Sequence, residues 1–586
     1  MKHSSSLFAF VLLCAASPLV SCASAARTPP PAPITQSAAP LPQRSADERW
    51  AELVAAFIEE YLSLHPSTAV SLGRHEFDGQ LPDFSRAGIE RVIASLASAR
   101  ERASAFSEAE LGKEQRFERA YLLSRVDSEL FWLREQRVPF KNPAFYIDAG
   151  LDPGTYVNMP YAPPDVRLRA FIAYAQKVPA AVAQIRANLE LPLPRTFIAF
   201  AHAGFAGFAQ FYRNDVPRAF AEVKSEELQS QLTAAIEPAA RAMTELATWL
   251  EAERPKASDA FAIGAERFAQ MLQQTERVDT PLAELLAVGQ RDLERNHKAL
   301  AEACGKYLPK RPISACVDKL NRDKPSSGAV AGAREQLAML RQFIVDRRIV
   351  SIPDPQVALV AEAPPYRRQN FAYIDIPGPY EKNVPAVYYI APPDPSWSRA
   401  EQEAYVPGKA DLMFTSVHEV WPGHFLQFLH SNRAPSRFGQ IFVGYAFAEG
   451  WAHYAEELMV EEGLAQNDPA LHIGQLLNAL LRNVRFVCAI GLHTQGMSVQ
   501  DCETLFREQA YQDAGNARQQ AARGTYDPAY LNYTLGKLLL RKLRSDWRTE
   551  HPDRALSEFH DAVLSSGGPP IPLLRTRLLT QPSASL

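Results

Sequence analysis

Apolar side chains recur at the spacing of an amphipathic helix in one segment after another of this 586-residue chain. The first such segment starts at Asp47 and ends where His65 and Pro66 interrupt the pattern. Residues three and four apart lie on one face of a helix, so each segment can bury one side against its neighbours. Further segments of this kind occupy residues 87–105, 114–135, 166–189, 226–253 and 282–303. The pattern predicts a mainly α-helical body.

One stretch, residues 370–390, has a different pattern. Two short runs rich in β-branched and aromatic residues, 371–376 and 384–390, lie on either side of a Pro/Gly turn. Such runs favour short β-strands, so we expect a small hairpin or sheet beside the helices. The second run ends shortly before His418. The strands could therefore line the same cleft as that residue, or they could only cover the core.

The composition is that of a globular protein, with 47% hydrophobic residues, 22% charged residues and a formal net charge of −4. No extended run of one charge sign occurs, which argues against a nucleic-acid partner. The length alone would allow several small domains or one large helical body. We find no internal repeat with a period of roughly 20–50 residues. We expect a single large helical domain over residues 47–580.

The N-terminus has the features of an export signal. Residues 1–22 contain an early positive charge, an apolar run and small residues, and they end in Leu19-Val20-Ser21-Cys22, which resembles a bacterial lipobox. In a lipobox the cysteine is lipidated and anchors the mature protein to a membrane. Cleavage after Ala25 would instead release a soluble periplasmic protein. We favour the lipoprotein, and Ala23 after the cysteine suggests, by resemblance to other lipoproteins, the outer membrane.

Residues 23–46 are rich in proline and alanine and cannot form a core, so we expect a flexible tether. Four cysteines remain for the folded body. Cys304 and Cys316 flank a loop with lysines and prolines, and export would allow a local disulfide between them. Cys488 and Cys502 are interpreted as buried apolar residues.

The residues with the clearest chemical signal lie at 418–424, where His418 and Glu419 are followed by Pro422, Gly423 and His424. In the His-Glu-x-x-His motif, two histidines four residues apart bind zinc, and the glutamate activates the water on the metal. Here the fourth position is Pro422, and His424 would lie about 240° around an ideal helix from His418. The pair can bind one metal only if the Pro-Gly step breaks or widens the helical turn.

A second strongly helical segment begins near Glu449 and supplies a carboxylate. Two histidines and this glutamate would form a three-ligand site with one open position. His453 lies four residues after Glu449 on the same helix face. It could orient that carboxylate, or it could replace His424 as the second histidine ligand. Glu456 and Glu457 are predicted to lie on a solvated face.

At these residues the chain resembles the bacterial family called domain of unknown function 885. That family is similar to the helical gluzincin zinc peptidases, which include thermostable carboxypeptidase and angiotensin-converting enzyme. The resemblance extends over most of the mature chain. The motifs that carry it are Pro66–Gly73, Leu81–Ser85, His418-Glu419 with Pro422-Gly423-His424, Gly491-Leu492-His493 and Tyr533–Lys537.

Geometry and resemblance together suggest a role for each residue. His418, His424 and Glu449 would bind Zn²⁺, and Glu419 would act as general base. The negative oxygen that forms on a substrate carbonyl during hydrolysis would need a hydrogen-bond donor. Tyr533 is the first candidate for this donor and His493 the second. The metal site is expected within residues 411–460 and the helices on the substrate side within 475–550. The resemblance also implies a large helical body with a deep cleft.

Three arginines are candidates to bind the C-terminal carboxylate of a substrate, because a guanidinium can hold a carboxylate with two hydrogen bonds. They are Arg485, Arg523 and Arg544.

The leading hypothesis is a zinc-dependent peptidase that acts on short peptides in the periplasm. The expectation that it works from the C-terminal end rests on the peptidase relatives alone. One alternative is a non-catalytic, lipid-anchored helical protein that binds a peptide or a metal, and another is a zinc amidohydrolase acting on a non-peptide amide. Any contact with a membrane is expected through the lipid anchor only. The sequence leaves the oligomeric state open.

Overall fold

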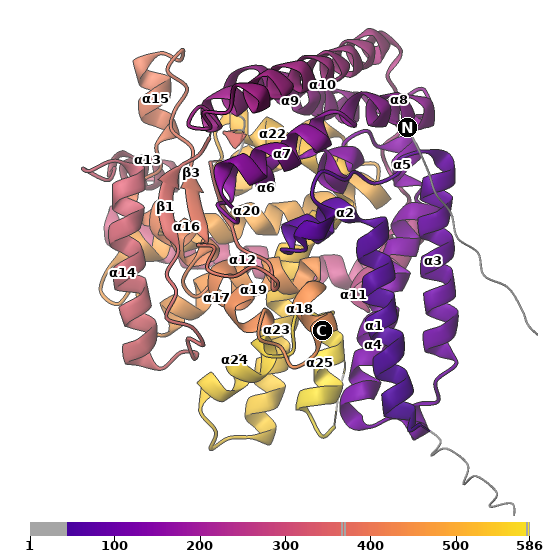
Figure 1. Cartoon of the computed structure of the whole chain (residues 1–586). Coiled ribbons are helices and arrows are strands. Elements are labelled where there is room, and N and C mark those ends of the chain that lie inside the picture. Colours follow the sequence, from indigo (N-terminus) through magenta and orange to yellow (C-terminus); the bar gives the residue numbers. More distant parts are fainter. Residues whose placement is uncertain (1–43, 365–366, 369–370, 582–583, 585) are drawn as a thin grey trace, which may run out of the picture. The chain divides into compact units, whose positions relative to one another are not determined.

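The structure is a computed structural model that describes residues 44–586 except 365–366, 369–370, 582–583 and 585. The predicted export signal, Cys22 and nearly all of the predicted tether therefore lie outside the described residues. Residues Ala46–Leu586 form one compact unit. Helices dominate this unit, together with one small sheet, as the sequence pattern predicts (Figure 1).

The N-terminal part of the unit is a group of long helices. It contains α1 (Ala46–Leu64), α3 (Arg86–Ser104) and α4 (Lys113–Leu130), which continues into a π-type turn at Phe131–Glu135. α3 packs against both α1 and α4. Trp50 and Phe57 of α1 are buried, as their helical spacing predicts.

A second group of helices packs around α10 (Glu226–Glu253). α9 (Arg195–Ala219) lies along it, and α7 (Pro164–Ala175) and α8 (Val178–Asn188) pack on it as well. We expected one continuous helix over residues 166–189, but the structure has two. Pro179 explains the break, because proline has no backbone N–H and is suited to the first turn of a new helix.

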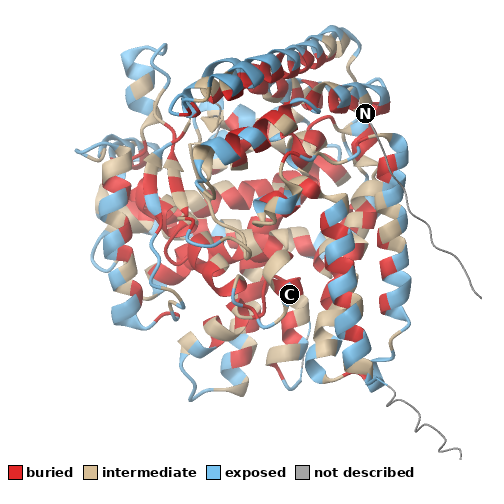
Figure 2. Ribbon diagram, in the orientation of Figure 1, coloured by how far each residue is buried: buried red, intermediate tan, exposed pale blue. Residues whose placement is uncertain are grey.

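The central group of helices carries the candidate site. It contains α12 (Leu282–Tyr307), α16 (Lys409–Glu419), α19 (Tyr445–Glu461), α20 (Pro469–Thr494) and α23 (Asn532–Glu550). α20 packs along α12 and crosses α16, while α19 packs along α23. α16, α19 and α20 are largely buried, whereas α1, α3 and α10 expose their outer faces (Figure 2).

Among the described residues, α20 alone is long and apolar enough to cross a membrane. Within its most apolar stretch, however, 78% of the residues are buried inside the protein. Its apolar character is therefore accounted for by its place in the core.

The sheet has the strand order β1-β3-β2. β2 (Ala372–Asp375) and β3 (Val387–Ile390) are antiparallel, with Tyr373 opposite Tyr389, and both lie within the runs predicted as strands. β1 (Leu359–Glu362) pairs in parallel with β3 and was not predicted. β1 contacts α14 (Ala329–Arg347), and β2 contacts α16, the helix that ends with His418 and Glu419.

Shorter helices and turns connect these groups. The remaining helices are α2 (Pro66–Ser71), α5 (Val138–Lys141), α6 (Gly154–Asn158), α11 (Ala265–Glu276), α13 (Ile313–Arg322), α15 (Arg399–Tyr405), α17 (His424–Ser431), α18 (Arg437–Ile441), α21 (Val499–Gln509), α22 (Ala514–Tyr526), α24 (Leu556–Leu564) and α25 (Ile571–Leu578). Single 3-10 or π turns lie at His75–Phe77, Glu108–Glu110, Ile147–Leu151, Arg254–Lys256 and Pro528–Leu531.

Two disulfides join neighbouring helices. Cys304 and Cys316 form the local bridge that the sequence suggested, between α12 and α13. Cys488 and Cys502 are buried, as expected, but they are also bonded to each other, so their interpretation as simple apolar residues was wrong. α21 packs on α20 and brings the two Cα atoms to 5.6 Å, a separation that suits a disulfide.

Candidate metal centre

The helix that carries His418 ends immediately after Glu419, and a new helix begins at His424. The connection requires Gly423, because a Cβ atom there would lie 1.8 Å from the carbonyl oxygen of His418. The Trp421–Pro422 peptide bond within it is cis. In a continuous helix the two histidines would project to different sides. The break turns them toward each other, and their ring centroids lie 4.7 Å apart.

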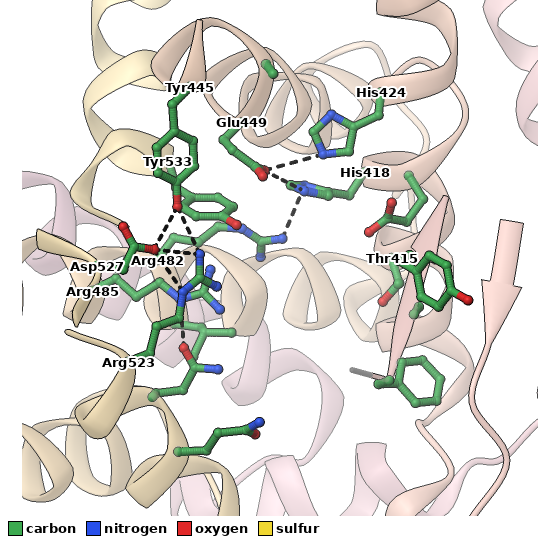
Figure 3. Close-up of a pocket in the computed structure, with 18 of the residues that line it drawn as sticks. Thr415, His418, His424, Tyr445, Glu449, Arg482, Arg485, Arg523, Asp527 and Tyr533 are labelled. Carbon is green, nitrogen blue, oxygen red and sulfur yellow. Dashed lines mark hydrogen bonds and ion pairs between the residues drawn. The ribbon is translucent and has the colours of Figure 1, made fainter. Parts of the chain in front are cut away.

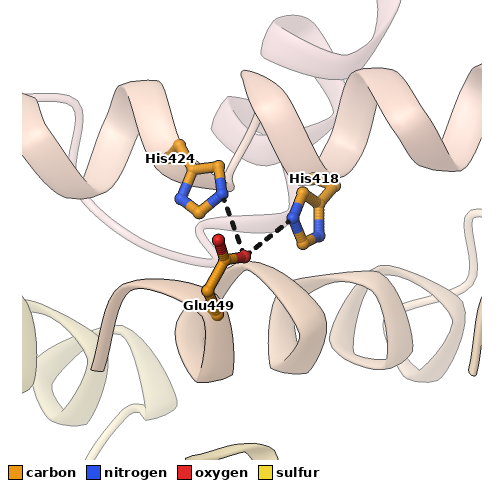
Figure 4. Close-up of side chains that lie close together, drawn as sticks. All are labelled: His418, His424 and Glu449. Carbon is orange, nitrogen blue, oxygen red and sulfur yellow. Dashed lines mark ion pairs between the residues drawn. The ribbon is translucent and has the colours of Figure 1, made fainter. Parts of the chain in front are cut away.

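Glu449, near the start of α19, completes the cluster (Figure 4). Its Oε2 atom lies 3.2 Å from Nε2 of His418 and 3.4 Å from Nε2 of His424. Suitable ligand atoms of all three residues lie within 4.8 Å of one another. The structure therefore brings together the three residues predicted as zinc ligands.

The donor set and its electrostatics fit a cation. Oε2 of Glu449 is buried and accepts no hydrogen bond, although two imidazole nitrogens lie at ion-pair distance from it. Burial raises the pKa of Glu449, but His424 and His418 outweigh that effect and hold the pKa well below its usual value. A cation held between His418, His424 and Glu449 would thus be stabilised by the ionised carboxylate. Two imidazole nitrogens and one carboxylate oxygen are typical ligands of catalytic zinc.

Glu456 holds His418 from behind. Its Oε1 atom lies 2.7 Å from Nδ1 of His418, and the side chain has no exposed surface. Burial lowers the pKa of His418, but the carboxylates of Glu449 and Glu456 raise it more, to about 9. When Nδ1–H donates to Glu456, the lone pair of Nε2 points to the cluster. A carboxylate in this position fixes the ring and strengthens a metal-binding histidine.

Two predictions about α19 need correction. Glu456 and Glu457 do not lie on a solvated face, since both are buried, and Glu457 pairs with Arg295 at 2.8 Å. His453 is fully buried and lies outside the ligand cluster. Its Nδ1 atom lies 3.3 Å from Glu456, so it neither replaces His424 nor contacts the carboxylate of Glu449. Every residue of α19 from Gly450 to Met459 is buried, which an amphipathic pattern does not anticipate.

A cavity of about 3260 Å³ opens onto the cluster. Glu419 and Tyr533 line it beside the three candidate ligands. The ring of Tyr533 lies 6.3 Å from that of His418. Burial, aided by the charge of Glu449, raises the pKa of Tyr533, so its hydroxyl keeps its proton at neutral pH and can donate it in a hydrogen bond. The β2 strand lines the same cavity through Tyr373 and its neighbours, which settles the placement that the sequence left open.

Of the three candidate arginines, two reach the cavity. Arg485 on α20 and Arg523 on α22 line it, and Figure 3 shows both near Tyr533. Arg544 lies outside the cavity and binds Glu461 at 2.7 Å and the hydroxyl of Tyr454 at 3.0 Å. Arg544 is therefore not placed to bind a substrate carboxylate in this cavity.

His493 is also placed away from the cavity. Its Nε2 atom lies 2.7 Å from the carbonyl oxygen of Gly524, and its Nδ1 atom faces the backbone N–H of Ile263. The ring packs against Phe268. With both nitrogens engaged by the backbone, His493 joins chain segments and is not available as an oxyanion donor.

Sequence reasoning missed several polar residues around the site. Arg482 on α20 contacts Glu456 at 3.1 Å, and Tyr445 on α19 bonds Asp527 at 3.1 Å and Arg523 at 2.9 Å. Glu456 had a usable signal, because it follows Glu449 by two helical turns and so lies on the same face. Tyr445 and Asp527 had no comparable signal, since segments far apart in the sequence bring them together.

The comparisons with known proteins agree with this architecture. The structure resembles that of a presumed lipoprotein of unknown function from Shewanella oneidensis, with a TM-score of 0.74, 23% identity, and coverage of 91% of this chain and 100% of the other. It also resembles that of a presumed lipoprotein from Colwellia psychrerythraea, with a TM-score of 0.76, 18% identity, and coverage of 91% and 98%.

At these identities the two structures show a shared fold. A search of curated proteins gives no significant match. The family model described as "Bacterial protein of unknown function (DUF885)" matches residues 66–578, which includes every residue of the candidate site. The chain therefore belongs to the DUF885 family of bacterial proteins.

Proposed function

We propose that this protein is a zinc-dependent peptidase that hydrolyses short peptides. The observation that carries the proposal is the convergence of His418, His424 and Glu449 at one edge of a large cavity. The broken helix between the two histidines supports it, because that break has a specific backbone requirement at Gly423. The resemblance of the motifs to those of helical gluzincin peptidases supports the choice of reaction.

Each residue at the site would have a defined part in hydrolysis. A zinc ion held by the three ligands would polarise the substrate carbonyl and lower the pKa of a coordinated water to about 7. Glu419 lines the cavity next to His418, so its carboxylate would accept a proton and later pass it to the leaving amine. The hydroxyl of Tyr533 would donate a hydrogen bond to the negative oxygen that develops on the substrate.

The size of the cavity supports a peptide as substrate. Its volume of about 3260 Å³ is several times that of a usual small-molecule site, which is roughly 300–1,000 Å³. Aromatic side chains such as Phe200 and Tyr526, which stack at 4.5 Å, contribute to its walls and would contact apolar substrate side chains.

Metal analysis and peptide cleavage test this function together. Purified protein should contain about one zinc per chain, and His418→Ala, His424→Ala and Glu449→Ala should each lose it. Glu419→Gln should keep the zinc and lose hydrolysis of a peptide library, read by mass spectrometry. Glu403→Gln is the matched control, because Glu403 also lines the cavity but is exposed, pairs with Arg399 and lies outside the ligand cluster. Zinc-loaded protein that cleaves no peptide would exclude the peptidase.

We further propose that the protein is exported and anchored through a lipid on Cys22. The lipobox-like sequence supports this, as does the description of both structural neighbours as presumed lipoproteins. Cys22→Ala should move the protein from the membrane fraction to the soluble fraction of a cell extract. Continued sedimentation with membranes would argue against the lipid anchor.

A further inference from the structure

One buried cation in the cavity has no carboxylate partner among the described residues. The side chain of Arg485 is only 7% exposed, and no aspartate or glutamate forms an ion pair with it in the part of the chain that the structure describes. Its one hydrogen bond there is from Nε to Oε1 of Gln520, a neutral group, at 2.9 Å. Burying a charge without a counter-ion costs free energy. An anionic group that enters the cavity would therefore be stabilised beside Arg485.

The neighbouring arginines differ from Arg485 in this respect. Arg482 pairs with Glu456 at 3.1 Å, and Arg523 pairs with Asp527 at 2.9 Å. All three guanidinium groups surround the ring of Tyr533, and Arg485 is the nearest, with Cζ 4.7 Å from the ring centroid. Burial, together with the charges of Arg523 and Arg482, lowers the pKa of Arg485.

Arg485 lines the same cavity as the candidate metal centre. A single aromatic ring connects them, because Tyr533 contacts Arg485 on one side and lies 6.3 Å from the ring of His418 on the other. In a peptide, the terminal carboxylate carbon lies at most about 3.7 Å from the carbonyl carbon of the last peptide bond. A peptide bound by its terminal carboxylate can therefore present one of its last bonds to the metal centre.

We propose that Arg485 binds the C-terminal carboxylate of the substrate and so makes the enzyme a carboxypeptidase. This inference rests on the proposed peptidase function and adds the substrate class and the direction of cleavage. A carboxylate can accept two parallel hydrogen bonds from a guanidinium. The ring of Tyr533 lies beside the guanidinium of Arg485. Peptides without a free carboxyl end would leave the charge of Arg485 unpaired.

Binding measurements test the site without relying on turnover. The zinc-loaded Glu419→Gln protein is titrated by calorimetry with acetyl-Ala-Ala-Phe as the free acid and as the C-terminal amide. The free acid should bind at least ~30-fold more tightly, as expected for a buried ion pair. A third peptide, acetyl-Ala-Glu-Phe-amide, carries its carboxylate on a side chain. Equal binding of acid and amide would overturn the proposal, and so would equal binding of the free acid and the third peptide.

Two variants locate the effect at Arg485. Arg485→Gln removes the cation, and Gln520→Glu places a carboxylate where Arg485 already donates a hydrogen bond. Both should abolish the preference for the free acid and keep the zinc, and Gln520→Glu should do so even if Arg485→Gln fails to fold. Arg548→Gln on the exposed end of α23 is the control and should keep the preference. A preference that survives in Gln520→Glu would contradict the assignment.

The same experiments separate the two proposals. A free-acid preference in a protein that cleaves nothing would support the carboxylate site and exclude the peptidase. Cleavage of internal bonds, with acid and amide substrates treated alike, would support the peptidase and exclude the role of Arg485.

Discussion

The Nδ1 atom of His418 lies 2.7 Å from a carboxylate oxygen of Glu456 that no solvent reaches. Burial raises the pKa of Glu456, but Arg482, His453 and His418 together outweigh burial and hold the pKa below its usual value. The carboxylate is therefore ionised at neutral pH. An ionised carboxylate without these partners would be too costly to bury. The contact therefore belongs to a network of buried charges, and it leaves the other nitrogen of His418 facing Glu449 in the candidate metal centre.

Replacing Glu456 with glutamine should weaken zinc binding. The change removes the charge that orients His418, and loss of such a partner typically reduces metal affinity by about 10- to 100-fold. Competition with a chromophoric chelator measures this directly. Glu457→Gln is the matched control, because Glu457 is also buried but pairs with Arg295 and Lys537 rather than with a candidate ligand. Equal zinc affinity in both folded variants would contradict the role of Glu456.

A glycine contact sets the distance between α19 and α23. A Cβ atom on Gly536 would lie 2.0 Å from the carbonyl oxygen of Ala446, and one on Gly450 would lie 2.4 Å from Cα of Gly536. Gly450 directly follows Glu449, and Gly536 lies about one helical turn after Tyr533. The close approach of the two helices therefore also brings the side chains of Glu449 and Tyr533 to one site.

Gly536→Ala should therefore destabilise the protein by about 1–3 kcal/mol through overpacking. Hydrolysis by the proposed peptidase should slow with it, because the helix that carries Tyr533 must move away from Glu449. Urea unfolding and peptide hydrolysis measure the two effects. Gly305→Ala in α12 is the control, because no atom lies near its Cβ position and alanine favours a helix by about 0.5–1 kcal/mol. Stability losses of similar size in both variants would rule out the contact.

The sequence predicted the mainly helical class and the three side chains of the candidate metal centre. Apolar spacing placed α1, α3, α10 and α12 to within a few residues, because each has exposed residues on one face. The cluster could be inferred because Pro422 and Gly423 themselves indicate a break in the helix. With that break, two histidines six residues apart can face the same site.

The buried polar residues were harder to predict, for a physical reason. A helix segment that is buried on every face, as α19 is from Gly450 to Met459, has no solvated face from which the inner face could be deduced. Glu456 and Glu457 therefore looked like surface residues. Similarly, Arg485 and Arg544 have the same chemistry in sequence, and only the packing of α20 and α23 against other segments decides which one faces the cavity.

The stability of the protein should fall between about pH 6.5 and pH 4 because of His493. Burial lowers the pKa of this imidazole from 6.5 to about 4, against the opposing hydrogen bond with Gly524. In that window the unfolded chain binds a proton that the folded protein does not, so stability is complete above the unfolded pKa and decreases as the pH falls. The contribution is up to roughly 3 kcal/mol.

His493→Gln should make stability less dependent on pH in this window, because glutamine can still donate to the carbonyl of Gly524 but cannot take up a proton. Urea unfolding at several pH values between 4 and 7.5 gives the slopes. Parallel curves for the two proteins would show that His493 does not cause the acid sensitivity.

The bond between Cys488 and Cys502 should stabilise the half of α20 that carries Arg485. Cys488 follows Arg485 by one helical turn, and the bridge ties this turn to α21. Closing a loop of this size in the unfolded chain typically contributes about 3 kcal/mol. A Cys488→Ala, Cys502→Ala double variant should therefore melt at a lower temperature, while its zinc content stays unchanged because the ligands lie on α16, α17 and α19.

The same variant should bind acetyl-Ala-Ala-Phe more weakly, since the helix that presents Arg485 loses its tie to α21. Cys304→Ala with Cys316→Ala is the comparison, because that bridge joins α12 to α13 and leaves α20 tied to α21. It should lower the melting temperature and keep peptide affinity. Peptide mapping under non-reducing conditions must first find both bridges, and free thiols at 488 and 502 in the purified protein would remove the basis of this prediction.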